Sequence, residues 1–182
     1  MTGRVTQVVL LCEDNQHEAF ARRFLGKLGV SPRSIRVVKS PKGRGSAEHW
    51  VKLQYAQEVR HLRAGRHIIG RALVVLIDED TASTQSRQSA LATSLEQAGF
   101  PPRAHDEQII HAVPARNIET WLAYLDGQTV DEQTAYPKLE QQRDCKKQVE
   151  TLKVMCDSRK LKEPAPSSLV ATCSEFRSRW KP

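Results

Sequence analysis

The sequence has few cysteines and no long apolar stretch, and both absences narrow the class of protein. Four cysteines occur in 182 residues, and none form a CxxC pair. Structural zinc sites and disulfide frameworks depend on paired cysteines, so we expect reduced thiols. The longest apolar runs are far shorter than the ~20 residues that span a bilayer, and no secretory signal pattern begins the chain. We therefore expect a soluble, cytoplasmic protein without a membrane partner.

A P-loop is also absent, because the pattern GxxxxGK[ST] does not occur. A different glycine-containing segment, SPKGRGSAEHW at 40–50, carries Lys42 and Arg44 just before an expected helix. Backbone N–H groups at a helix N-terminus and nearby cations favour phosphate, although an ordinary connection has the same composition. The net charge of +7 and the pI near 9.4 are compatible with a polyanionic partner such as nucleic acid.

The most informative stretch is RALVVLIDEDT at 71–81. Its short β-branched run is typical of a central strand buried on both faces, and it ends in three acids. Side chains alternate along extended backbone, so Asp78 and Asp80 can point the same way while Glu79 points elsewhere. Clustered carboxylates need compensation, for which a divalent cation is the simplest candidate. The alternative is that Asp80 or Thr81 only caps the next helix.

Strand-like and helix-like segments alternate along the chain. Strands are expected at 5–12, 34–39, 72–77 and 107–113, and helices at about 16–28, 47–63, 84–98, 117–126 and 167–180. This order predicts an α/β fold with an open, mostly parallel four-stranded sheet flanked by helices. We expect a catalytic domain at 1–126 and a helical C-terminal extension at 127–182 that packs on it. Helical spacing of apolar residues also occurs between 134 and 162.

Both acidic clusters follow strands. Glu13 comes after the first strand, and Asp78 and Asp80 come after the third. Ligands of open α/β sheets bind beyond the carboxyl ends of the strands. If these two strands are neighbours, the three acids can form one divalent metal site of the kind used in phosphoryl transfer.

This pattern resembles the Toprim fold of topoisomerases, bacterial primases and OLD-type nucleases. The first motif is LLCEDNQHEAFARRFL at 10–25, the second is VVLIDEDT at 74–81, and the segment VPARNIETW at 113–121 is similar to one in small OLD-like proteins of phage-defence contexts. The resemblance covers roughly residues 5–125. It implies a nuclease, acting on DNA or RNA as an effector of anti-phage defence, that uses Mg²⁺ or Mn²⁺. Because no ATPase segment precedes the motifs, a separate ATPase subunit is an expected partner.

The resemblance also implies roles for individual residues. Asp78 and Asp80 would hold metal, Glu13 would be a metal ligand or general acid/base, and Glu119 would be a further ligand. Phosphate-binding candidates are Lys42, Arg44 and Arg116, followed by Lys138, Lys146 and Lys147 in the tail. The alternative for Glu119 is a purely structural carboxylate in the first turn of a helix.

The chain departs from the family pattern near Glu13. Asp14 stands where the family usually has glycine, and His17 stands where OLD-type enzymes often have a second acid. A second metal would need Glu119 together with His17 or Glu18, so the sequence leaves open whether one or two ions bind. Two other hypotheses remain: a non-catalytic subunit that binds nucleic acid or an ATPase, and a flavodoxin-like receiver domain, for which the acceptor aspartate and its Lys/Thr partners are missing.

Overall fold

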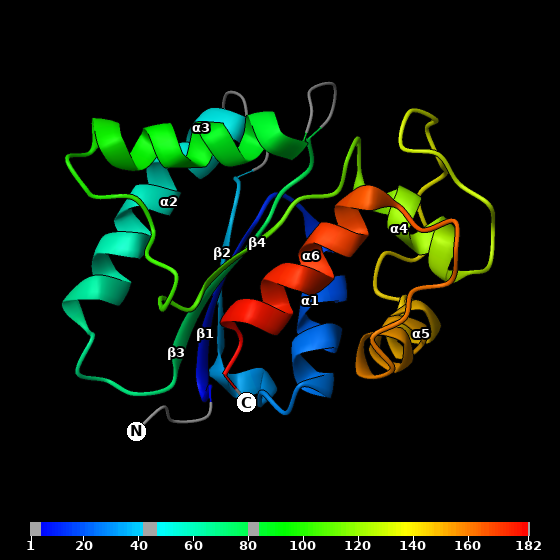
Figure 1. The fold of residues 1–182 in the computed structure, drawn as a ribbon, viewed down its shortest axis with the longest axis horizontal. Coiled ribbons are helices and arrows are strands. Elements are labelled where there is room, and N and C mark those ends of the chain that lie inside the picture. Colours follow the sequence, from blue (N-terminus) through cyan, green and yellow to red (C-terminus); the bar gives the residue numbers. More distant parts are fainter. Residues whose placement is uncertain (1–4, 42–46, 80–83, 182) are drawn as a thin grey trace.

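A four-stranded, all-parallel open sheet forms the centre of the computed structural model, which describes residues 5–41, 47–79 and 84–181 (Figure 1). The strands lie in the order β2-β1-β3-β4, so the first and third strands are neighbours. This confirms the expected α/β class. The strands are β1 (Gln7–Cys12), β2 (Ile35–Lys39), β3 (Arg71–Leu76) and β4 (Ile109–Ala112).

Helices connect the parallel strands and continue beyond the last of them. A short 3-10 helix, Pro32–Ser34, precedes β2. The α-helices are α1 (Asn15–Lys27), α2 (Ala47–Ala64), α3 (Thr84–Gln97), α4 (Ile118–Leu125), α5 (Lys146–Asp157) and α6 (Ser167–Arg179). The helices expected from hydrophobic spacing therefore form close to their predicted bounds. The stretch 134–162 is helical only within α5, and Pro137 lies in the non-helical part, consistent with its lack of an N–H donor.

Alternate residues of the buried strands face opposite layers. Ala72, Val74 and Leu76 of β3 pack with the layer of α1, α4, α5 and α6. Leu73 and Val75 pack with the layer of α2 and α3, which lies on the other side of the sheet in Figure 1. Burial on both faces explains why β3 reads as a continuous apolar run.

The C-terminal segment contributes directly to the core. Leu152 of α5 and Leu169 of α6 belong to the same buried cluster as the strand residues. Arg103 links α6 to the edge strand β4. Its guanidinium donates to both carboxylate oxygens of Glu175 in α6 at 2.7 Å, and to the carbonyl of Ile109 in β4. Residues of α5 and α6 therefore share a hydrophobic core with the strands. The division into two domains at residue 126 stays a prediction.

Candidate metal centre

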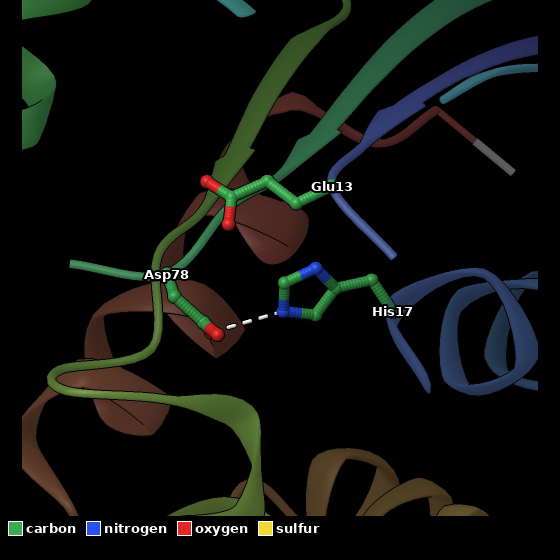
Figure 2. A group of neighbouring side chains, drawn as sticks. All are labelled: Glu13, His17 and Asp78. Carbon is green, nitrogen blue, oxygen red and sulfur yellow. Dashed lines mark hydrogen bonds and ion pairs between the residues drawn. The ribbon is translucent and has the colours of Figure 1, made fainter. Parts of the chain in front are cut away.

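Three side chains meet at the carboxyl edge of the sheet. Glu13 directly follows β1, Asp78 lies two residues beyond β3, and His17 lies in the first turn of α1. Because β1 and β3 pair with Cys12 opposite Leu76, their carboxyl ends bring the two acids to the same place. One donor atom of each residue lies within 4.8 Å of the donor atoms of the other two. Figure 2 shows the three side chains converging from the two strand ends and the helix.

Asp14 fixes the position of His17. Asp14 is the N-cap of α1, with extended backbone angles, and its Oδ1 accepts a hydrogen bond of 2.9 Å from the His17 backbone N–H. This is the usual way in which an aspartate satisfies a free N–H at a helix start. The acid that stands in place of the family's glycine thus begins α1 so that the third residue of the helix points its side chain at the sheet edge.

His17 is bonded to Asp78 inside the protein. The His17 ring is fully buried, Asp78 is 8 % exposed, and His17 Nε2 lies 2.9 Å from Asp78 Oδ1. Burial lowers the pKa of His17, but the carboxylates of Asp78, Asp14 and Glu13 raise it, and the result is a pKa of about 9. The imidazole therefore carries a proton at neutral pH, and its bond to Asp78 is a charge-assisted one.

Glu119 belongs to the same electrostatic environment. It is in the first turn of α4 and 3 % exposed. Burial raises the pKa of the Glu119 carboxyl, and the charge of Asp78 raises it further, while its own backbone N–H, Lys138 and His17 act in the opposite direction. Glu119 is thus close enough to Asp78 and His17 to interact with them, and Lys138 interacts with Glu119. Glu119 is not one of the three groups whose donor atoms converge within 4.8 Å.

The neighbouring acid, Glu79, points to the opposite layer. It is 3 % exposed, and its Oε2 accepts a hydrogen bond of 3.1 Å from the Arg87 backbone N–H in α3. The Arg87 guanidinium Nε lies 3.9 Å from the same oxygen. The sequence-based expectation that Glu79 points away from Asp78 is therefore met, and this acid is compensated by an arginine.

Of four further candidates from the sequence, the structure describes only Arg116. Asp80, Lys42 and Arg44 lie outside the described residues. Arg116 has a left-handed backbone with φ of 66°, and its Nη1 donates to the Gln133 carbonyl at 3.0 Å, so its guanidinium contacts the chain beyond α4.

Glu18 and Asn117 lie near the sequence motifs but outside the cluster of converging donor atoms. Glu18 accepts hydrogen bonds from Arg22 and Lys39, and it lies outside the converging donor group. Asn117 occupies the N-cap position of α4, but its side chain makes no capping hydrogen bond. Its Oδ1 is buried without a hydrogen-bond partner in the part of the chain that is described.

The donor set of the cluster fits a divalent transition metal. Two carboxylates and one imidazole combine the ligands that suit Mn²⁺ with one that Zn²⁺ or Fe²⁺ accepts and that Mg²⁺ seldom uses. Ligands of one ion at about 2.1 Å lie at most ~4.2 Å apart, so a small rotation of the side chains brings these three groups together. His17 Nδ1 is buried without a hydrogen-bond partner and lies 3.6 Å from Asp14 Oδ1, which is the acid that could orient the ring from behind.

Sequence reasoning identified the two acids but gave His17 only a subsidiary place. The local signal in its favour is the aspartate N-cap three residues earlier, which begins the helix directly after the strand and places His17 in its first turn. Glu18, its neighbour, was an equal candidate in the sequence, and the helix turns it toward Arg22 and Lys39 instead.

Comparison with protein-family models, with curated proteins and with solved structures gives no match to this chain. The resemblance to Toprim proteins thus rests on the sequence motifs and stays a prediction. In the structure, the two strands that precede these motifs, β1 and β3, are neighbours. Among the described residues, no helix has the length and apolar character needed to cross a membrane.

Proposed function

We propose that this chain is a metal-dependent nuclease that hydrolyses phosphodiester bonds in nucleic acid, with a Toprim-like arrangement of Glu13, His17 and Asp78 as its metal centre. The observation that carries the proposal is the convergence of one acid from each of two adjacent parallel strands on a buried histidine. A divalent ion held there would supply Lewis acidity and a more acidic bound water, which are the properties that phosphodiester hydrolysis needs.

The residues of the chain have distinct roles in this proposal. Glu13 and Asp78 would provide oxygen ligands to the ion, and His17 would provide Nε2 in its deprotonated form. Burial and the charge of Asp78 raise the pKa of Glu119, and we assign this carboxyl the role of proton donor to the leaving oxygen. Lys138, which acts on Glu119 electrostatically, is one described cation that we propose attracts phosphate to this edge. Asp80 is proposed as a further ligand on sequence grounds alone.

The test is cleavage of plasmid DNA and of a structured RNA by purified protein with Mn²⁺, with Mg²⁺ and with EDTA. Asp78→Asn keeps the size of the side chain and removes its charge, so we expect cleavage to be lost. The matched control is Asp157→Asn, which removes an exposed aspartate that pairs with Lys153 on α5. Cleavage at the wild-type rate by folded Asp78→Asn protein would contradict the proposal.

The hydrogen bond between His17 and Asp78 supports a second candidate function. A protonated His17 neutralises Asp78 without any metal, as expected for a non-catalytic subunit that binds nucleic acid or a separate ATPase. Under this hypothesis, the protein binds nucleic acid equally well in Mn²⁺ and in EDTA, and Asp78→Asn leaves binding unchanged. Detection of Mn²⁺ bound to the wild type but not to Asp78→Asn would exclude this alternative.

A further inference from the structure

A basic groove lies beside the metal centre. It is a depression of about 400 Å³ formed by the outer face of α1, the end of β2 and the segment that precedes α5. The lining cations are Arg22, Arg23, Lys39 and Arg143, and the lining acid is Glu18. Four positive charges against one negative charge give the groove a local excess of +3 within a chain whose net charge is +7.

The cations of the groove are held in place by the protein. Glu18 accepts a hydrogen bond of 2.9 Å from Arg22 Nε and one of 2.8 Å from Lys39 Nζ. Burial raises the pKa of Glu18, but the hydrogen bonds from Lys39 and Arg22 outweigh it and the pKa is lowered, so this acid stays ionised and keeps both cations in position. Arg23 donates through Nε and Nη2 to the Arg143 carbonyl, which ties α1 to the other wall.

The groove begins at the same edge of the sheet as the metal centre. Lys39 ends β2 and is paired in register with Cys12, the residue before Glu13. From there the lining residues of α1 run from Asn15 to Arg23, which is about 12 Å along a helix. That length corresponds to the rise of about three nucleotides of one strand.

We propose that this groove binds the phosphate backbone of the nucleic-acid substrate a few nucleotides away from the bond that is cleaved. The proposal rests on the proposed function for its substrate class. It adds a binding site that consists of Arg22, Arg23, Lys39 and Arg143, and it predicts recognition of phosphates rather than of base sequence.

The test measures binding in EDTA, where cleavage cannot take place, with fluorescently labelled duplex DNA and RNA of one sequence at several salt concentrations. The double variant Lys39→Gln/Arg143→Gln removes one cation from each wall. The control, Lys160→Gln/Lys162→Gln, removes two exposed lysines outside the groove and changes the net charge equally. The slope of log K against log salt is negative, and we expect the groove variant to make it less steep by about 1.8 for duplex DNA. This is ~0.9 for each lost phosphate contact.

The binding and cleavage measurements test the groove and the nuclease activity separately. If the groove variant binds like the control while the wild type cleaves in Mn²⁺, the groove assignment is wrong and the nuclease stands. If the groove variant loses affinity but the wild type does not cleave, the groove is confirmed as a nucleic-acid site and the nuclease is wrong. A wild-type protein that binds neither DNA nor RNA would overturn the groove assignment.

An independent observation concerns two cysteines in the C-terminal layer. Cys156 of α5 and Cys173 of α6 are free thiols whose Sγ atoms lie 3.2 Å apart. The hydrogen bond from Cys173 lowers the pKa of Cys156 despite partial burial, and the same bond raises that of Cys173. Cys156 is partly exposed, whereas Cys12 and Cys145 are buried and have raised pKa values.

We infer that Cys156 and Cys173 are a peroxide-sensitive pair that joins α5 to α6. The Cys156 thiol and hydrogen peroxide give a sulfenic acid and water. The Cys173 thiol then attacks the Cys156 sulfur, forming the disulfide and releasing a second water. The sulfur atoms need only approach from 3.2 Å to the ~2.05 Å of a disulfide.

Intact-mass measurement and peptide mapping after peroxide treatment test this inference. We expect a loss of 2 Da in the wild type and in Cys145→Ser, with the bond mapped to Cys156 and Cys173. In Cys173→Ser we expect a sulfenic acid at Cys156 that dimedone labels. A wild-type protein that keeps all four thiols, or forms a different bond, would overturn the inference.

Discussion

Two adjacent acids at the end of β3 are compensated in chemically different ways. Asp78 points to the α1 and α4 layer and bonds to His17, while Glu79 points to the α2 and α3 layer and faces Arg87. Arginine keeps its proton at any pH that proteins tolerate and offers no lone pair to a metal. Histidine can release its proton and then bind a cation. The comparison teaches that Glu79 faces a permanent positive charge, whereas the Asp78 side can exchange a proton for an ion.

The largest expected difference between the two acids is in stability. Glu79→Gln removes the negative charge whose Oε2 lies 3.9 Å from the buried Arg87 Nε, and breaking a buried ion pair costs about 3–5 kcal/mol. Asp78→Asn should cost less, about 1–2 kcal/mol, because His17 can become neutral and its Nε2–H can still donate to the new amide oxygen. Urea unfolding in EDTA measures both values. If Asp78→Asn proves the more damaging change, the two acids have the opposite roles in the fold.

The pH dependence of stability should come from the Asp78 side. Because the folded pKa of His17, about 9, exceeds its ordinary value of 6.5, its contribution is fully present below pH 6.5 and is lost as the pH rises through 9. We expect the unfolding free energy of the metal-free protein to fall across this window, by up to about 3 kcal/mol. His17→Gln should flatten the profile, and Glu79→Gln should leave its shape unchanged. An unfolding profile that His17→Gln does not alter would contradict the pKa assigned to His17.

The next largest expected difference between Asp78 and Glu79 is their effect on Mn²⁺ affinity. Asp78→Asn removes a proposed ligand, and we expect Mn²⁺ affinity to fall at least ~100-fold, or about 2.7 kcal/mol. In Glu79→Gln protein that remains folded, the affinity should stay within a few-fold of the wild type. Titration calorimetry at pH 7.5 measures both. An equal loss of Mn²⁺ affinity in the two variants would contradict the claim that Asp78 binds the ion and Glu79 does not.

The smallest expected effect is that of Glu119. Its raised pKa and its position outside the converging donor group suggest a role in proton transfer more than in holding metal. Glu119→Gln should therefore reduce cleavage about tenfold or more, within the range of general acid catalysis, while Mn²⁺ affinity changes less than tenfold. Single-turnover cleavage and calorimetry distinguish these effects. A loss of Mn²⁺ affinity as large as that of Asp78→Asn would make Glu119 a ligand instead.

Sequence patterns predicted the sheet well because each strand carries its own signal. The apolar runs of β1 and β3, with acids directly after them, were enough to expect carboxylates that converge if the two strands are neighbours, and the strand order makes them neighbours. The same reasoning could not choose between His17 and Glu18, because both are polar residues in the first turns of α1 and only tertiary contacts with Asp78 or Lys39 decide their directions. Arg116 shows the same limit, since its contact with Gln133 joins segments whose packing no local pattern encodes.

The remaining predictions about function come from the motif resemblance. The nuclease activity, the anti-phage role, the ATPase partner and the cytoplasmic location all stay predictions. The structure adds the histidine to the proposed donor set, and this favours Mn²⁺ over Mg²⁺ as the first ion to test.

The most direct test of the account is a crystal of the protein soaked in MnCl₂ and examined by anomalous scattering. We expect a manganese peak bonded to oxygen atoms of Glu13 and Asp78 and to Nε2 of His17, with the His17–Asp78 hydrogen bond broken. A structure at the same Mn²⁺ concentration in which that hydrogen bond persists and no peak lies between the three residues would contradict the central claim.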